Sequence, residues 1–460
     1  MSCLLEIVSE AKPEWQTAIE EMVETKALSQ ILVLAYQLAQ LIARDLVEAL
    51  LAKRASTPTQ WGNCPKCGRK LESKGRKQRQ LETMIGRIRW KRASGRCRQK
   101  CAIGQQTPLD VELGIEPYQK TERRLQRLAI LLAIFVPFDS AAMLLNQLLG
   151  IQVSATSIWN WVQEKGSECM RQLEAELNAL SSDQLPDPEG IDPHLHNLML
   201  LIGADGVMVA FRPEHGSARG RTRWREVKVG IFARLQQYRS RAGQLIPRLT
   251  HHRVVAVLGD IDDLASRMRL EAFKQSIWLA PKVVWLSDGA RGFWRLYREQ
   301  FQPYAVGILD FYHASQNLWL GLRGWLDGRT TSAKLFFRLS RRRLRSGQSQ
   351  AVLDDIQAAL QLDGLPACAQ KSLSKIYNYL YKHRDHIQYD AFKQSGCPIG
   401  SGFVESTCKW LIQQRFKGVG MRWSEDGFNH LLHLRLAWVN GRFDDLFLPP
   451  PSHNYARAQL

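Results

Sequence analysis

The pattern of apolar and polar positions predicts two buried strands flanking a helix in the middle of the chain. Residues 282–287 (KVVWLS) and 305–309 (AVGIL) are short, apolar and rich in β-formers, and an aspartate follows each, Asp288 and Asp310. Apolar residues recur at helical spacing between them. A strand–helix–strand unit of this length predicts a parallel pair with a right-handed crossover. Carboxylates at the C-terminal ends of parallel strands lie where open α/β sheets bind ligands, although an aspartate before glycine is also an ordinary turn or cap residue.

Three further strands are predicted before this unit, at Leu198–Val209, Trp224–Leu235 and His252–Leu258. Asp205 lies inside the first, where a carboxylate is costly unless it faces a site or a metal. Three antiparallel strands followed by two parallel ones predict an α/β domain with a mixed five-stranded sheet, in the order of the RNase H-like fold. In that fold the carboxylates of the first and fourth strands lie side by side and hold two divalent metal ions. The nearby acids Asp260, Asp262 and Asp263 are interpreted as caps of a helix over 264–273.

A third carboxylate has to come from a later helix, and Glu405 is the best candidate. It lies in the segment PIGSGFVESTCK, residues 398–409, where Ser401 or Gly402 begins a helix that continues to about Arg415. Taken alone, the position of Glu405 favours a carboxylate that interacts with the helix dipole.

Two cysteine pairs enclose a compact module, with CPKC at Cys64 and Cys67 and CRQKC at Cys97 and Cys101. Four thiolates in two close pairs predict one tetrahedral Zn²⁺ site, a zinc ribbon, although the second pair has three intervening residues. In residues 84–91, lysine and arginine alternate with apolar residues and glycine, which predicts a strand with one basic face. Fourteen lysines and arginines against two glutamates lie in the module, about +12 of the formal charge of +19. That charge favours phosphate contact over a purely structural ribbon.

Helical patterns surround this module. Residues 27–51 predict a long helix, which is interpreted as a packing helix, with self-association as the alternative. Residues 139–165 predict a helix-turn-helix with Gly150 in the turn. Its second helix buries Ile158, Trp161 and Val162, which leaves Asn160 and Gln163 to read bases. Many helical hairpins share this pattern without binding DNA.

Composition narrows the class of protein. The hydrophobic fraction of 45% and charged fraction of 23% are those of a soluble globular protein. A pI near 9.7 favours a polyanionic partner, nucleic acid before membrane. Metal-spaced cysteines predict a reducing cytoplasm. The opening residues do not predict a signal peptide, and the longest apolar run, 128–138, is too short to span a bilayer.

Together these segments resemble bacterial insertion-sequence DDE transposases, and most closely the ISKra-type group with an N-terminal zinc ribbon. The likeness covers about residues 60–445, and its most specific parts are LSDGARGFW, ILDFYHASQNLW and KGVGMRWSEDG. It implies a catalytic triad of Asp205, Asp288 and Glu405 holding two Mg²⁺ or Mn²⁺ ions. It also implies that Asp310 and His313 form the carboxylate-x-x-His element that precedes an inserted helical domain in related enzymes. The basic residues of that insertion, expected to bind DNA, include Arg341, Arg342, Arg343 and Arg345.

The expected organisation is a helical segment (1–55), zinc ribbon (60–110), helix-turn-helix domain (118–180), RNase H-like first part (195–325), helical insertion (326–395), second part (396–445) and tail (446–460). The resemblance implies a transposase that binds double-stranded element ends and target DNA as a homodimer or higher oligomer, in the bacterial cytoplasm at the nucleoid and without a membrane partner. Two alternatives stay open: an RNase H-like nuclease of recombination or repair, and a non-catalytic DNA-binding regulator.

Overall fold

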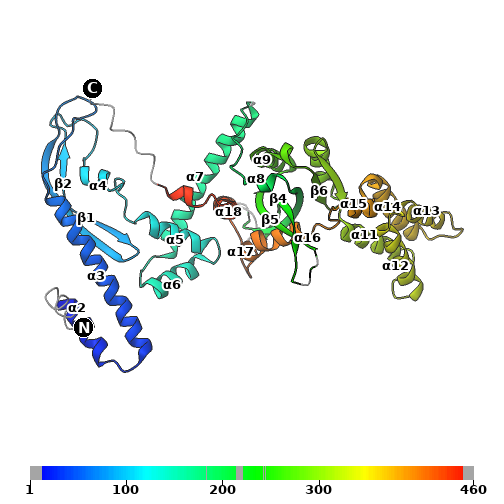
Figure 1. Ribbon diagram of the computed structural model, residues 1–460, viewed down its shortest axis with the longest axis horizontal. Coiled ribbons are helices and arrows are strands. Elements are labelled where there is room, and N and C mark those ends of the chain that lie inside the picture. The colour runs from blue at the N-terminus through cyan, green and yellow to red at the C-terminus, as the bar shows by residue number, and fades with distance from the viewer. Residues whose placement is uncertain (1–12, 183, 214–220, 242, 244, 449–460) are drawn as a thin grey trace. The chain divides into compact units, whose positions relative to one another are not determined.

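The computed structural model describes residues 13–182, 184–213, 221–241, 243 and 245–448. The chain divides into two compact units, Met1–Val162 with Asp444–Leu460, and Gln163–Phe443 (Figure 1). The division falls inside the helix α7 (Ala155–Ser181), whereas the sequence predicted a boundary between residues 180 and 195. The C-terminal half of α7 belongs to the second unit because it packs closely there: a Cβ on Gly166 would lie 2.5 Å from the Cβ of His430.

The first unit holds a β-hairpin with helices around it. Its elements are α2 (Pro13–Glu24), α3 (Leu28–Ser56), β1 (Glu72–Thr83), β2 (Gly86–Arg96), α4 (Pro108–Glu112), α5 (Arg123–Ala133), α6 (Phe138–Leu149), the start of α7 and η5 (Asp444–Phe447). A small core joins Leu51 of α3 to Leu81, Ile88 and Trp90 of the hairpin. The predicted basic face is present on β2, where Arg87, Arg89 and Lys91 are exposed. The strand begins at Gly86, because residues 84–85 form the turn of the hairpin.

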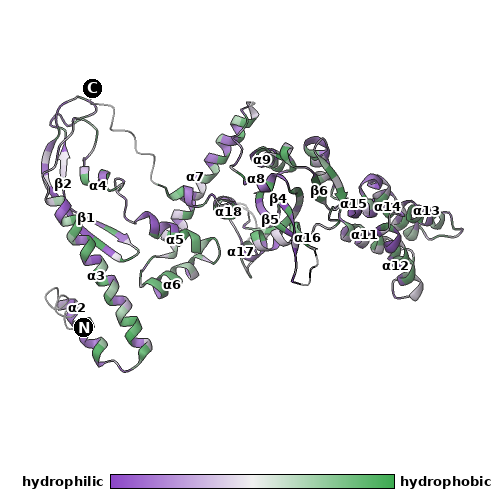
Figure 2. Ribbon diagram, viewed as in Figure 1, coloured by the Kyte–Doolittle hydropathy of each residue, from purple (hydrophilic) through white to green (hydrophobic). Residues whose placement is uncertain are grey.

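The helix α3 packs against the hairpin by its C-terminal part and against α2 near its middle, where the buried Asp45 accepts a hydrogen bond from Trp15 Nε1 at 2.8 Å. The buried residues of α3 are Asp45, Leu51 and Ala55, whereas Leu28, Leu32 and Leu46 are more than 60% exposed. Green hydrophobic residues recur along its length in Figure 2. Among the described helices it is the one long and apolar enough to cross a membrane, judged by length and composition. The packing interpretation therefore fits the end of α3 that touches the ribbon and its contact with α2, and leaves the rest of the helix without a described role.

The predicted hairpin of helices is formed by α6 and α7. Gly150 ends α6 in the left-handed conformation (φ 68°), and the Ser154 hydroxyl accepts a hydrogen bond from the Ser157 backbone N–H at the start of α7. Ala141, Leu145, Ile158 and Val162 are buried. The first helix begins one residue earlier than its predicted cap, so Asp139 lies in its first turn.

The second unit is built on a mixed five-stranded sheet. Its strands are β3 (Met199–Phe211), β4 (Arg223–Arg239), β5 (Leu245–Val257), β6 (Val283–Ser287) and β7 (Ala305–Leu309), in the spatial order β5-β4-β3-β6-β7. The first three pair antiparallel, and β3–β6 and β6–β7 pair parallel. The predicted mixed sheet is confirmed, and its order is consistent with the RNase H-like fold. β7 has the predicted bounds, and β5 begins earlier than predicted.

Helices cover both faces of this sheet. On one face lies α9 (Ile261–Lys274), where a Cβ on Gly230 of β4 would meet Met268 Sδ at 2.7 Å. On the other lies α16 (Gly402–Thr407), where a Cβ on Gly203 of β3 would meet Val404 Cγ2 at 2.4 Å. The cap interpretation is confirmed at α9: Asp260 and Asp263 form a capping box, while Asp262 pairs with Arg295 at 2.8 Å.

The remaining helices of this unit lie on either side of the insertion and within it. Outside it are α8 (Pro193–His196), η1 (Ile277–Leu279), α10 (Arg291–Leu296), η2 (Tyr297–Phe301), η4 (Cys408–Gln413), α17 (Gln414–Phe416) and α18 (Glu425–Val439). Next to β7 comes α11 (Phe311–Arg323), followed by α12 (Thr331–Arg345), α13 (Ser349–Leu360), α14 (Ala367–Lys382), η3 (Arg384–His386) and α15 (Tyr389–Gln394) (Figure 1). Leu344, Ile356, Leu373 and Ile376 belong to the same buried cluster as β6 and β7. The helical segment is therefore packed into the second unit.

Candidate functional site

On three adjacent strands, an aspartate directly follows each of three residues that pair in register. The last in-register pair of β3 and β6 is Ala204 with Ser287, and Ser287 also pairs with Leu309 of β7. Each of these three residues is followed by an aspartate, Asp205, Asp288 or Asp310. Because the strands run parallel, the aspartates gather at one edge, where α/β sheets bind ligands. The sequence prediction that Asp205 and Asp288 lie on adjacent strands agrees with this register.

The helix α16 brings Glu405 to the face of the sheet that carries Asp205. Gly203 and Asp205 are two residues apart in β3, so their side-chain positions share a face. Val404 packs against the Gly203 position, and Glu405 is the next residue. Glu405 is exposed, and its carboxylate lies 3.6 Å from Lys409 Nζ. The helix continues as the π-helical turn η4, a local form that is frequent at functional sites.

The charges of the three acids act on one another. Burial raises the pKa of Asp205, and the negative charges of Asp288 and Glu405 raise it further, against the hydrogen bond donated by the Gly206 backbone N–H at 2.7 Å. The buried thiol of Cys408 lies within reach of the same carboxylate, and desolvation followed by the charges of Asp205 and Glu405 raises its pKa. This arrangement is one that a bound cation would relieve.

Asp288 has a local structural role as well. Its Oδ1 accepts a hydrogen bond from the Ala290 backbone N–H at 3.0 Å, and its carbonyl accepts one from Trp294 Nε1 at 2.6 Å. Asp288 therefore does cap the turn at Gly289, as an aspartate before glycine often does. A second oxygen of the same carboxylate has no hydrogen bond among the described residues, so the turn does not use the whole group.

Asp310 holds the segment that leads into α16. Its Oδ2 accepts hydrogen bonds from the Ser401 backbone N–H at 2.5 Å and the Ser401 hydroxyl at 2.8 Å. Its Oδ1 accepts from the His313 backbone N–H at 2.6 Å and lies 3.1 Å from His313 Nδ1. Desolvation opposes ionisation of Asp310, but these hydrogen bonds outweigh it and lower its pKa. The sequence did not identify Ser401 as a partner of Asp310; the two are 91 residues apart.

His313 faces the same acids. Its pKa is raised first by the hydrogen bond to Asp310 and then by the charges of Asp310, Asp288 and Glu405. An ionised carboxylate only accepts hydrogen bonds, so Nδ1 carries a proton and Nε2 is left to act on a ligand. Tyr379 of α14 lies beside these residues, because a Cβ on Gly289 would meet its ring at 2.2 Å. Burial raises the pKa of its hydroxyl, and its hydrogen bond with Asn317 opposes that shift.

The carboxylates of Asp205, Asp288 and Glu405 are less tightly grouped in this structure than the ligands of a single bound ion. Among the described residues, only the four cysteines form a group of three or more potential ligands that all lie within 4.8 Å of one another. Two ions about 3.5–4 Å apart are held by oxygens that are spread more widely than the ligands of one ion. Hard oxygen donors of this kind suit Mg²⁺ or Mn²⁺.

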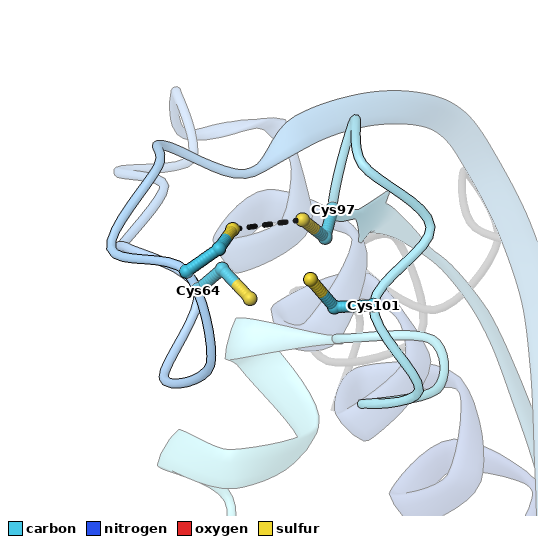
Figure 3. Close-up of side chains that lie close together, drawn as sticks. Cys64, Cys97 and Cys101 are labelled. Atoms are coloured by element: carbon cyan, nitrogen blue, oxygen red, sulfur yellow. Dashed lines mark hydrogen bonds between the residues drawn. The ribbon is translucent and has the colours of Figure 1, made fainter.

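The four cysteines form a compact cluster in the first unit. Figure 3 shows the sulfurs of Cys64, Cys97 and Cys101 directed toward a common centre, and Cys67 Sγ lies 3.4 Å from Cys97 Sγ. Gly68 (φ 70°) and Lys100 (φ 52°) form the tight turns that fold each pair back. Desolvation disfavours the Cys97 thiolate, but hydrogen bonds from Cys67 and nearby backbone N–H groups lower its pKa to about 7. Four sulfurs at this spacing can hold one tetrahedral Zn²⁺, so the wider second pair is no obstacle.

The predicted arginines of α12 have different surroundings. The Arg341 guanidinium lies over the Phe311 ring at 5.1 Å. Arg343 forms an ion pair with Asp355 of α13. Arg342 and Arg345 are exposed. The four therefore do not form one uniform basic surface.

The two predicted base-reading residues of α7 also differ. Asn160 is exposed. Gln163 is half-buried, and its Oε1 accepts a hydrogen bond from His430 Nδ1 of α18 at 2.6 Å. Helical spacing predicted that both lie on the outward face. At Gln163, however, α18 packs close to α7 near Gly166, so this residue contacts α18.

Comparisons with known proteins give little beyond this geometry. The sequence matches no protein-family model and no curated protein. Among solved structures, the chain is similar to the Drosophila P element transposase in its strand transfer complex, with a TM-score of 0.25 and 12% identity, over 74% of this chain and 83% of that chain. At that TM-score little of the two chains superposes, so function has to be argued from the residues of the site.

Proposed function

We propose that this protein is a DNA transposase of a bacterial insertion sequence, a DDE enzyme that cleaves element ends and joins them to target DNA. The observation that carries the proposal is the alignment of Asp205 and Asp288 on adjacent parallel strands, with Glu405 on a helix packed against Gly203 on the same face. The resemblance of the surrounding motifs to ISKra-type transposases supports the same reading.

Asp205, Asp288 and Glu405 would hold two Mg²⁺ or Mn²⁺ ions, which supply an activated oxygen nucleophile and stabilise the leaving oxygen of an in-line displacement at phosphorus. The burial and mutual repulsion that raise the pKa of Asp205 fit such a donor set. In cleavage, a water oxygen bonds to phosphorus while the P–O3′ bond breaks. In strand transfer, the freed 3′-hydroxyl oxygen bonds to a phosphorus of the target while the P–O3′ bond of that phosphodiester breaks, and the target O3′ leaves and takes up the proton. No covalent enzyme intermediate is required.

Asp310 and His313 support the reaction by fixing the positions of other groups near the site. Ionised Asp310 fixes the His313 ring through Nδ1 and fixes Ser401 at the entry to α16. The raised pKa of His313 favours its imidazolium form, in which Nε2–H donates to a phosphate oxygen. The two residues thereby link the strand that carries Asp310 to the helix that carries Glu405.

DNA affinity would come from the basic parts of the chain. The formal charge of +19 is concentrated in the zinc ribbon and in α12, and phosphate contacts of this kind give affinity with steep salt dependence. Sequence preference for element ends is assigned to Asn160 on α7. We expect a homodimer or higher oligomer on DNA.

Strand transfer is the experiment that decides between this function and its alternatives. Purified protein with Mg²⁺ is mixed with a duplex that ends in the terminal repeat flanking the gene, together with a circular target. Joined products support the transposase. Cleavage without joining would identify a nuclease of recombination or repair, and DNA binding without metal-dependent cleavage would identify a regulator.

A further inference from the structure

A groove between α11 and α12 is not used by the mechanism above. It has a volume of about 570 Å³, and three aromatic residues and three cations dominate its lining: Tyr312, Trp319, Phe337, Lys334, Arg338 and Arg341. Its size is within the range of small-molecule sites. We call it the α11–α12 groove.

The two helices present matching faces to the groove. Tyr312 and Trp319 are seven residues apart on α11, and Lys334 and Arg341 are seven apart on α12. Seven residues are two turns of helix, about 10 Å. At the far end, the rings of Trp319 and Phe337 touch, with centroids 5.1 Å apart and planes inclined by 53°. The groove is thus an aromatic strip with cations along one side.

The cations of the groove have no acidic partner within the described chain. α12 carries six lysines and arginines and no acid. None of Lys334, Arg338 and Arg341 forms an ion pair with a described residue, and Arg341 instead lies over the Phe311 ring. Their charge is therefore available to an anionic ligand, unlike that of Arg343, which Asp355 neutralises.

One end of the groove lies beside Gly400 and Asp310. Tyr312 lies between Asp310 and His313 in the sequence, and it is 63% exposed. Its ring lies against Gly400, where a Cβ would be 2.8 Å away, and Gly400 precedes the Ser401 that Asp310 holds. The groove therefore begins beside the segment that Asp310 holds, which leads into the helix carrying Glu405.

We propose that the α11–α12 groove binds unpaired nucleotides of a DNA strand next to the scissile phosphate, a role that rests on the proposed function. Aromatic faces stack on any base, and neighbouring cations pair with the backbone phosphates. A length of about 10 Å accommodates roughly three stacked nucleotides at about 3.4 Å each. Bases inside a duplex have their faces covered by their neighbours, so the aromatic strip favours a frayed or single-stranded flank over intact duplex.

Fluorescence anisotropy with the full-length protein, without added Mg²⁺ or Mn²⁺, tests the proposal without cleavage. The probes are a blunt duplex and the same duplex with a short oligothymidine tail. We expect the parent to prefer the tailed duplex, and Trp319→Leu to reduce that preference about tenfold, since one stacked base is lost. Trp278→Leu is the matched control, because Trp278 is 50% exposed and stacks on Phe273 away from the groove.

Each outcome decides which ligand, if any, the groove binds. If Trp319→Leu weakens both probes equally, the groove contacts duplex phosphates and the proposal is wrong; if neither probe changes, it does not bind DNA. Equal displacement of the tail by polyglutamate would mark a general anion site. Tyr312→Ala is the second variant should Trp319→Leu fail to fold, and it is expected to reduce the same preference. A parent that cleaves element ends without preferring the tail overturns the groove alone, whereas a parent that binds neither probe overturns the proposed function.

Discussion

Asp205 and Asp288 directly follow the last in-register pair of two adjacent parallel strands, Ala204 with Ser287. Ladder hydrogen bonds fix this register, so the relative position of the two carboxylates depends on the backbone of the sheet more than on side-chain packing. The third acid, Glu405, has no such ladder. It depends on the contact between α16 and Gly203 and on the hold of Asp310 on Ser401.

Asp205→Asn, Asp288→Asn and Glu405→Gln should each abolish metal-dependent cleavage and leave DNA affinity within about twofold. Each removes one charged ligand of a two-metal site but few phosphate contacts. Cleavage assays with Mg²⁺, and anisotropy without added Mg²⁺ or Mn²⁺, measure the two effects. Asp363→Asn, at an exposed position in a loop of the helical insertion, is the control and should behave as the parent. A triad variant that cleaves at the parental rate does not belong to the site.

The purified protein should contain about one zinc per chain. Changing Cys64 and Cys67 to serine should remove it, because two of four thiolates cannot close the tetrahedron, and should unfold the ribbon. Elemental analysis measures the metal. Cys368→Ser is the control, since Cys368 is exposed and outside the cluster. Protein purified without chelator that holds no zinc would contradict the assignment.

Arg342→Ala with Arg345→Ala should lower the slope of log affinity against log salt by about 1.8, since each lost phosphate contact removes about 0.9. Arg343→Ala should instead leave the slope unchanged and destabilise the fold by no more than about 1 kcal/mol, because its partner is Asp355. Titrations at several salt concentrations, with thermal unfolding alongside, separate the two. An unchanged slope in the double variant would assign both arginines to a solvated face.

Asn160→Ala should reduce the preference for element-end DNA over random DNA by about 1–3 kcal/mol, the value of one bidentate base contact. Gln163→Ala should leave that preference intact and lower stability, because Gln163 accepts a hydrogen bond from His430. Competition binding with the two DNAs gives the ratio. Equal discrimination by Asn160→Ala and the parent would make α7 a packing helix and place recognition elsewhere.

Asp310→Asn should destabilise the fold by about 1–3 kcal/mol, since the amide cannot accept all of the hydrogen bonds from Ser401 and His313. The folded pKa of Asp310 lies below its usual 3.8. Its ionised form therefore stabilises the native state above about pH 4, and that contribution is lost as the pH falls through the lowered pKa. Unfolding measured between pH 7 and pH 3, in parent and variant, should show a difference that shrinks in acid. A constant difference would contradict this role of the charge.

The sequence by itself determined the strands, their order and the acids that end them. Short, continuous apolar runs rich in β-formers that stop at Asp288 and Asp310 predict buried strands, and the cost of burying a carboxylate marks Asp205 inside its apolar strand. The cysteine pairs could also be found in the sequence, because the spacing of the metal ligands within each pair is local. The capping box of Asp260 and Asp263 was likewise written in adjacent residues.

Only the tertiary structure decided which polar groups meet across long separations. Ser401 finds Asp310 over 91 residues, and Gln163 is turned from a surface residue into a partner of His430 by a helix 267 residues away. Arg343 is taken by Asp355, and Tyr312, Trp319 and Phe337 form one groove only because α11 and α12 pack side by side. Periodicity fixes which face of a helix a residue occupies, but what covers that face depends on the packing of elements that the local pattern does not encode.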